Sequence, residues 1–163
     1  MKKVLYLATL LLTLAFTSCS KEEIGGTATE SLAGEWYVTA NMVENGSVVE
    51  DPYGMGRFTI MTYNTSANNP SEIWVDDNGN FWDFKVKAQA DASALTFSAA
   101  GAQNQKYDCQ VTITNAKITK GGGVQNNGSK ADYITMDVVF SDDEDQVVYR
   151  LEGVRYSGLA END

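Results

Sequence analysis

Short stretches of alternating apolar and polar residues recur along this chain, and they constrain its fold more than any other feature. In "EWYVTANMV", for example, Trp36, Val38 and Ala40 fall on one face of an extended strand. Turn-forming Gly, Asn and Asp residues separate the stretches. The pattern predicts an all-β domain with eight strands, at 35–43, 57–63, 72–76, 81–88, 94–99, 106–119, 133–140 and 147–156.

Eight alternating strands joined by short connections favour an antiparallel up-and-down barrel, because closure of the sheet removes exposed strand edges. A two-sheet β-sandwich is the competing architecture, and periodicity alone does not separate the two. We expect the barrel to occupy residues 32–157, followed by a C-terminal tail at 158–163. Asn78-Gly79 predicts a hairpin turn, and the three glycines at 121–123 predict a long turn between strands.

The N-terminus has the layout of a bacterial export signal. Lys2 and Lys3 precede an apolar stretch at 4–16, which is shorter than the roughly 20 apolar residues that span a bilayer. Small polar Thr17 and Ser18 follow and precede Cys19, and the resulting "FTSC" is similar to a bacterial lipobox. We therefore expect residues 1–18 to be a lipoprotein signal peptide.

Cys19 is the residue that a lipobox would expose as the new N-terminus. We expect it to be acylated, to anchor the protein to a membrane, and to begin a flexible tether at 19–31. A disulfide between Cys19 and Cys109 is the alternative. The following "SKEE" resembles the signal that sends some lipoproteins to the outer face of the outer membrane, with a solvated linker as the alternative. We therefore expect an outer-membrane lipoprotein that is exposed at the cell surface.

The chain is acidic and contains no histidine. Its formal net charge of −10 argues against nucleic acid as a partner, because such contacts need Lys and Arg. The missing histidine excludes Ser–His–Asp and Cys–His nucleophiles and any His-ligated metal. "DDNGN" begins like a calcium loop, but Phe81 replaces the required Gly and Lys87 stands where the bidentate Glu belongs. We expect neither a metal site nor a cofactor.

A carboxylate pair is the hydrolytic chemistry that this composition permits most readily. Asp83 and Glu152 lie in predicted strands, but alternation directs both to the outer wall. Cys109 is expected to face inward as a small hydrophobic residue. No residue pattern marks a catalytic site, so we expect a non-enzymatic protein.

In an up-and-down barrel of this kind, the connections at 44–56, 76–80, 100–106 and 141–146 meet at one end. They are rich in Asp and Glu, with Lys106 at their margin. One hypothesis is that this acidic mouth disfavours fatty-acid carboxylates and prefers neutral or cationic amphiphiles. The alternative is that the acidic turns are simply solvated. The long 44–56 segment could act as a lid over the mouth.

A Trp on the first predicted strand and an Arg near the end of the last resemble a pair of residues found in lipocalins and the wider calycin group. "GEWYV" carries Trp36 on the first strand, and Arg155 lies near the end of the last. In lipocalins such a Trp plugs the closed base of the barrel and such an Arg packs across it, so the resemblance implies a structural base plug here. The eight-strand topology puts both residues at the same end, where a cation–π contact would need them. Arg150 is the alternative partner in a different register.

Four motifs, "GEWYV", "IWVDDNGNFWDFKVK", "LTFS" and "LEGVRYSGLAEND", resemble a family of Bacteroidetes lipoproteins described as lipid-binding putative hydrolases. The similarity covers most of residues 32–163. It implies a lipocalin-like barrel that binds lipid. No residue pattern supports the hydrolase part of that description.

We therefore expect a cell-envelope lipoprotein whose barrel binds a small apolar or amphipathic, lipid-like molecule without catalysis. A barrel of about eight strands can enclose one small ligand or be filled by its own side chains. The alternatives are a filled-barrel interaction or structural lipoprotein that docks a protein partner, and a lipid-directed hydrolase. Trp74 and Trp82 are expected to serve packing, with ligand contact as the alternative. The candidate pocket residues are Met42, Phe58, Ile60, Phe84, Val86, Val111, Met136, Val138 and Tyr149.

Overall fold

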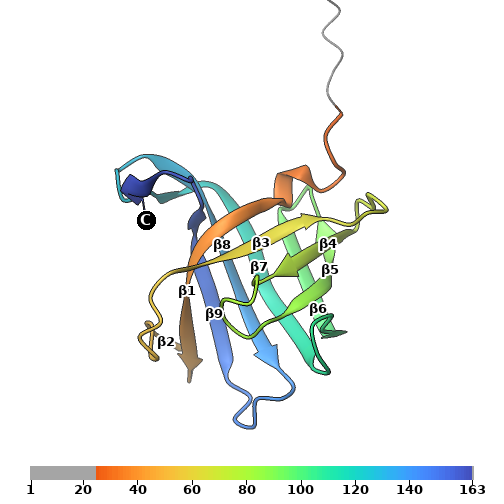
Figure 1. The fold of residues 1–163 in the computed structure, drawn as a ribbon, viewed down its shortest axis with the longest axis vertical. Helices are drawn as coiled ribbons and strands as arrows, with labels where there is room; N and C mark the ends of the chain where they lie inside the picture. The colour runs from red at the N-terminus through yellow and green to blue at the C-terminus, as the bar shows by residue number, and fades with distance from the viewer. Residues whose placement is uncertain (1–24, 163) are drawn as a thin grey trace, which may run out of the picture.

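The strands of this computed structural model follow one another in chain order around a barrel (Figure 1). The structure describes residues 25–162. Two short 3-10 helices, η1 (Glu30–Leu32) and η2 (Ala160–Asn162), lie near the two ends of this part of the chain. The strands between them are β1 (Gly34–Glu44), β2 (Ser47–Val49), β3 (Phe58–Asn64), β4 (Glu72–Asp76), β5 (Lys85–Asp91), β6 (Thr96–Gln103), β7 (Gln110–Val124), β8 (Lys130–Phe140) and β9 (Val148–Arg155).

The pairing of β1 with β9 closes the barrel. β1 pairs with β9 from Trp36 to Val43, and with β3 from Gly34 to Val38. Antiparallel pairings then connect β3 through β9 in sequence order, while the short β2 pairs with the end of β1. This arrangement confirms the predicted eight-stranded up-and-down barrel and is consistent with a lipocalin-like fold. The β-sandwich alternative is wrong.

Alternation along the strands separates the core from the outer wall. In β1, Trp36 and Val38 are buried while Tyr37 and Thr39 lie half-exposed on the outside. The inward-facing side chains form one hydrophobic core. This core and the pairings that close the barrel lie within residues 32–155, so this segment contains all the partners of its own strands.

The segment after β4 departs from the sequence prediction. The alternation predicts a strand at 81–88, whereas β5 begins at Lys85 and residues 77–84 form a loop. Asn78 and Gly79 have φ of 54° and 75°, which is the left-handed geometry of the predicted turn. The strand starts late because the Asp77 carboxylate accepts hydrogen bonds from the amides of this loop, which then cannot join the sheet.

The glycine stretch at 121–123, predicted as a turn, lies inside β7 instead. Gly123 pairs with Ala131 of β8, and the register shifts just before it. Gly121 has φ of 60°, so the extra residues form a bulge and the strand continues. The 44–56 segment, predicted as a lid, also contains strand β2 at Ser47–Val49.

The closed end of the barrel is packed around Trp36, which is fully buried. The guanidinium carbon of Arg155 lies 4.5 Å from the centroid of the Trp36 ring. The indole nitrogen donates to Thr62 Oγ1 at 2.9 Å, and Arg155 Nη1 donates to the carbonyl of Ala33 at 3.0 Å. The first strand, the third and the last are thereby tied together at the base.

Arg150, the alternative partner for Trp36, lies on the outer wall. Its Nε and Nη2 donate to the two carboxylate oxygens of Asp137 at 2.7 and 2.9 Å. Burial opposes ionisation of Asp137, but the hydrogen bonds from Arg150 and Asn115 outweigh it and hold the pKa of Asp137 below its usual range. Arg150 therefore joins β9 to β8 from outside.

The predicted signal peptide at 1–18 and the predicted lipidation site Cys19 lie outside the described residues. The described chain enters the fold through η1 at the closed end, which is drawn at the top of Figure 1. Among residues 25–162, no helix has the length and apolar character needed to cross a bilayer.

Candidate functional site: the mouth of the barrel

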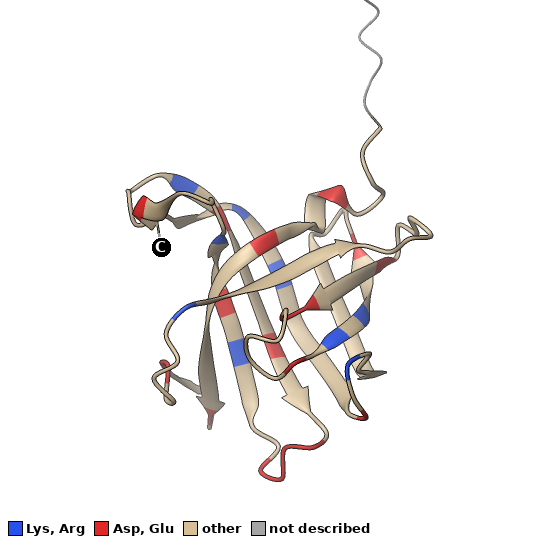
Figure 2. Ribbon diagram, viewed as in Figure 1, with Lys and Arg blue, Asp and Glu red and all other residues tan. Residues whose placement is uncertain are grey.

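The end of the barrel opposite Trp36 is its mouth, where four connections gather. These are residues 45–57, 77–84, 104–109 and 141–147. Figure 2 shows several acidic segments among these connections, including the one between β8 and β9 at the lower edge of the view. The grouping follows from up-and-down topology, which brings alternate connections to the same end.

The 77–84 loop is organised by a single carboxylate. Asp77 is fully buried, and its Oδ1 accepts hydrogen bonds from the amides of Gly79 and Phe84, both at 2.9 Å. Its Oδ2 accepts from the amides of Phe81 at 3.1 Å and Trp82 at 2.7 Å. These four bonds bend the loop so that its aromatic side chains turn into the mouth.

The aromatic residues of the loop pack against rings from other strands. Trp82 stacks on Phe140 with centroids 4.7 Å apart, and Phe81 stacks on Phe58 at 5.6 Å. The Phe81 ring also meets Tyr149 edge-on at 5.2 Å. This mouth aromatic cluster consists of Phe58, Phe81, Trp82, Phe84, Phe140 and Tyr149. It closes off the interior below it and presents an apolar floor to the outside.

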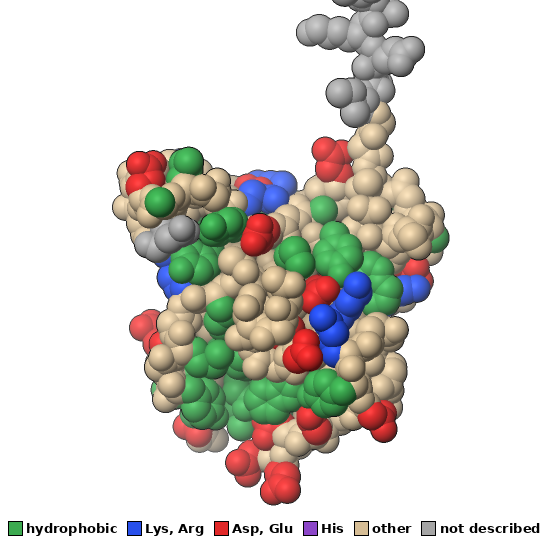
Figure 3. All heavy atoms as spheres, viewed as in Figure 1, with side chains coloured by type: hydrophobic (Ala, Val, Ile, Leu, Met, Phe, Trp, Pro, Cys, Tyr) green, Lys and Arg blue, Asp and Glu red, His purple; other side chains and the backbone are tan. Residues whose placement is uncertain are grey.

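Two cavities open at the mouth, and the first of them lies against this cluster. The apolar mouth cavity has a volume of about 270 Å³ and is lined by Tyr53, Met55, Phe81, Trp82 and Tyr149. The acidic mouth cavity has a volume of about 390 Å³ and is lined by Met42, Val43, Glu44, Tyr53, Asp145, Gln146, Val147 and Val148. Tyr53 belongs to both linings, so the two cavities are neighbours. Figure 3 shows apolar side chains gathered at the lower edge of the molecule with acidic side chains beside them.

Asp142 braces one side of the mouth. Its carboxylate accepts hydrogen bonds from Trp82 Nε1 at 3.2 Å, Tyr107 Oη at 2.8 Å and Cys109 Sγ at 3.0 Å. The bonds from Cys109, Tyr107 and Trp82 hold the pKa of Asp142 below its usual range. The buried Cys109 thiol and Trp82 Nε1 both donate hydrogen bonds to Asp142 Oδ1, so this carboxylate links the two side chains.

The predicted pocket residues separate into two groups. Met42 and Tyr149 line the mouth cavities, and Phe58 is half-buried in the aromatic cluster. The rest are fully buried in the packed core, namely Ile60, Phe84, Val86, Val111, Met136 and Val138. That these residues line a ligand pocket stays a prediction.

Sequence reasoning missed Tyr53, Met55 and Phe81. Phe81 was hidden because its segment alternates like a strand. Tyr53 and Met55 stand in "PYGMG", a loop sequence in which two large apolar side chains alternate with glycines. That pattern was the signal available in the sequence, and in the structure the two side chains are 59% and 43% exposed.

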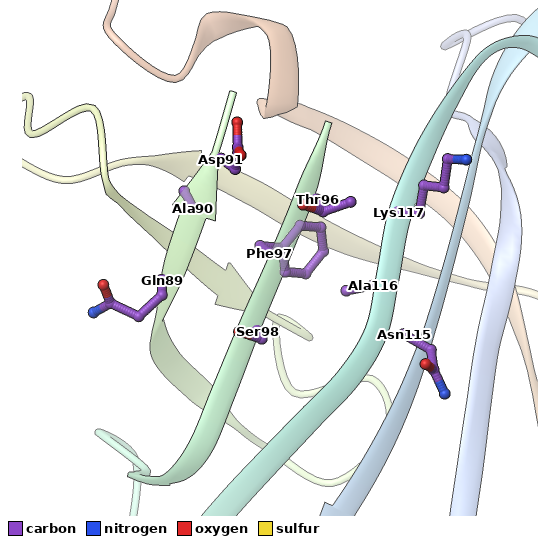
Figure 4. A pocket seen from close by; sticks show the side chains of 9 residues that line it. All are labelled: Gln89, Ala90, Asp91, Thr96, Phe97, Ser98, Asn115, Ala116 and Lys117. Atoms are coloured by element: carbon purple, nitrogen blue, oxygen red, sulfur yellow. The ribbon is translucent and has the colours of Figure 1, made fainter. Parts of the chain in front are cut away.

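Two further cavities share no lining residue with the mouth cavities. One, of about 560 Å³, lies over β5, β6 and β7. Figure 4 shows the Phe97 ring turned toward Ala116 on the neighbouring strand. The other, of about 400 Å³, includes Glu152, which accepts hydrogen bonds from Asn41 Nδ2 and Tyr133 Oη. The second of these is lined mainly by polar and charged side chains, whereas the lining of the apolar mouth cavity consists of aromatic side chains and Met55.

Asp83 and Trp74, two further residues singled out in the sequence, each lie beside a lysine side chain. Asp83 is exposed in the 77–84 loop, where it faces Lys106 at 3.7 Å. Trp74 lies under Lys85, whose Nζ is 5.1 Å from the ring centroid. Among residues 25–162, no group of three or more His, Cys, Asp or Glu side chains could hold a metal ion.

The model of a protein family described as "lipid-binding putative hydrolase" matches residues 21–160. No curated protein matches the chain.

Proposed function

The chain belongs to the family of lipid-binding putative hydrolases, and from this premise we propose that it binds the apolar part of a lipid-like molecule at the mouth of its barrel. The observation that carries the proposal is the apolar mouth cavity, whose walls are four aromatic side chains and Met55. Ligand sites are typically concave and lined by apolar and aromatic residues.

The proposal places the ligand at the mouth and leaves the packed interior undisturbed. The core below the aromatic cluster consists of fully buried side chains such as Ile60, Met136 and Val138. An acyl chain seated on the cluster would gain about 0.8 kcal/mol for each methylene that it buries. A few methylenes supply useful affinity once the entropic cost of binding is subtracted.

We further propose that the protein is a non-catalytic lipoprotein of the cell envelope. The lipobox-like "FTSC", which ends at Cys19, supports the anchor, and the absence of histidine from the sequence supports a binding role. A second candidate is a surface interaction module that docks a partner through the mouth loops. The fully buried interior favours this candidate, because a filled barrel needs no internal ligand.

A fluorescence titration tests the binding proposal. Residues 20–163 are titrated with N-phenyl-1-naphthylamine, a neutral probe that brightens in apolar surroundings. We expect saturable binding, and the double variant Tyr53→Ser/Met55→Ser is expected to weaken it about tenfold, because each substitution removes apolar contact area. Both side chains are largely exposed, so the fold should survive the change.

The matched control is Leu159→Ser, which removes an apolar side chain of similar exposure (51%) from the tail after β9. It is expected to leave probe binding unchanged. Equal weakening by the control and the double variant would contradict a site at the mouth. Failure of the unaltered protein to bind the probe would favour the interaction module.

A further inference from the structure

We infer that the preferred ligand at the mouth is a cationic single-chain amphiphile, with its chain in the apolar mouth cavity and its head group in the acidic one. The inference rests on the proposed function, since it assigns a ligand class to the same site. It starts from the shared wall: Tyr53 lines both cavities, so a molecule lying across this ring touches both.

The two cavities have different chemistry on either side of Tyr53. The apolar mouth cavity has no charged residue in its lining. The acidic mouth cavity is lined by the carboxylates of Glu44 and Asp145, and neither lining contains Lys or Arg. An elongated molecule with an apolar end and a positive end matches this order.

Nearby basic groups of the described chain have partners elsewhere. Lys106 faces Asp83, and Lys85 lies over Trp74 and Tyr63. The Arg57 guanidinium stacks on Tyr37 on the outer wall, with its carbon 4.1 Å from the ring centroid. The negative potential at the acidic mouth cavity is therefore not cancelled by an adjacent cation.

The aromatic wall adds a second source of attraction. A ligand cation within about 6 Å of an aromatic ring is drawn to the ring face, and quaternary ammonium groups are recognised in this way. Tyr53, which lines both cavities, lies 6.4 Å by ring centroid from Tyr149 of the apolar mouth cavity. A carboxylate head group would instead meet Glu44 and Asp145 with the same sign of charge.

Three dodecyl probes with the same chain separate charge from apolar binding. Dodecyltrimethylammonium, dodecanol and dodecanoate are each titrated into residues 20–163 by calorimetry below their aggregation limits. We expect the ammonium to bind about fivefold or more tightly than the alcohol, and the carboxylate to bind most weakly. Raising the salt from about 20 mM to about 300 mM should shrink this preference, because exposed charges are screened.

The double variant Glu44→Gln/Asp145→Asn removes both charges while keeping side-chain size. It is expected to lower the ratio of ammonium to alcohol affinity about fivefold. The control Glu30→Gln/Glu35→Gln removes two charges from the closed end, where η1 and the start of β1 lie, and should leave the ratio unchanged.

The outcomes distinguish the charge preference from the proposed binding of a lipid-like molecule. Equal affinity for all three probes at both salt concentrations would overturn the charge preference and leave the proposed function intact. Tightest binding of dodecanoate would also overturn it. Failure to bind any of the probes would overturn the proposed function and this inference together.

Discussion

At the scale of single residues, the mouth depends on a carboxylate that no ligand would touch. Asp77 is fully buried and receives four backbone amide bonds from its own loop. Amides that lose a buried acceptor retain the cost of leaving water, so this residue stabilises the loop more than its size suggests. Asp142, from the connection between β8 and β9, likewise accepts a hydrogen bond from the indole nitrogen of Trp82.

Substitution of Asp77 by Asn is expected to lower the free energy of unfolding by about 3 kcal/mol. The carboxamide keeps one oxygen but turns an NH₂ group toward two amide donors, so two of the four bonds are lost. Urea denaturation measures the change. Asp83→Asn in the same loop should cost less than about 0.5 kcal/mol, because its ion pair with Lys106 is exposed. Equal costs for the two variants would contradict the bracing role.

At the scale of elements, the contact between β1 and β9 turns the sheet into a barrel. Gly153 lies opposite Val38 in this contact. A methyl group added at Gly153 would stand 2.7 Å from Val38 Cα and would also collide with the carbonyl oxygen of Tyr37. The strands can approach this closely because Gly153 has no side chain.

Gly153→Ala is therefore expected to destabilise the protein by about 2 kcal/mol or more, since rigid backbone atoms must move. Thermal or urea unfolding measures the loss, and amide hydrogen exchange should show earlier opening of β1 and β9 than of β7. Gly25→Ala is the control, because no heavy atom lies within 4 Å of the added carbon. Unchanged stability of Gly153→Ala would show that the two strands tolerate a wider separation.

At the scale of the whole molecule, the point where the described chain enters the barrel and the mouth of the barrel lie at opposite ends. The described chain enters the barrel through η1 beside the base plug, and the two mouth cavities lie at the other end. If Cys19 carries the proposed anchor, the mouth has room to face away from the membrane, and its acidic connections would point toward solvent (Figure 2). That orientation suits capture of an amphiphile from outside the anchoring leaflet.

The anchor is tested by metabolic labelling of the full chain with an alkyne analogue of palmitate. The unaltered protein is expected to incorporate the label, and Cys19→Ala is expected to lose it, because acylation needs this thiol. Cys109→Ala is the matched control: its thiol is buried in the barrel, so labelling should persist. Label retained in Cys19→Ala would contradict the lipoprotein proposal.

The strand positions and the barrel could be predicted because inside and outside alternate locally. In β1, Trp36, Val38 and Ala40 are buried at every second position, and this period identifies the buried face of the strand. The same rule failed at 81–84, where alternating aromatic residues belong to a loop. Local pattern cannot show that Asp77 draws the amides of this segment away from the sheet.

The sequence by itself determined the all-β class, the number of barrel strands and the acidic character of the mouth connections, because periodicity, turn residues and charge are carried by neighbouring residues. The tertiary structure decided where the candidate site lies. Tyr53, Phe81 and Tyr149 come from three separate segments, and the cavity they share exists only once closure of β1 on β9 brings those segments together. The spacing of residues along the chain does not encode such contacts, so the cavity could be found only in the folded barrel.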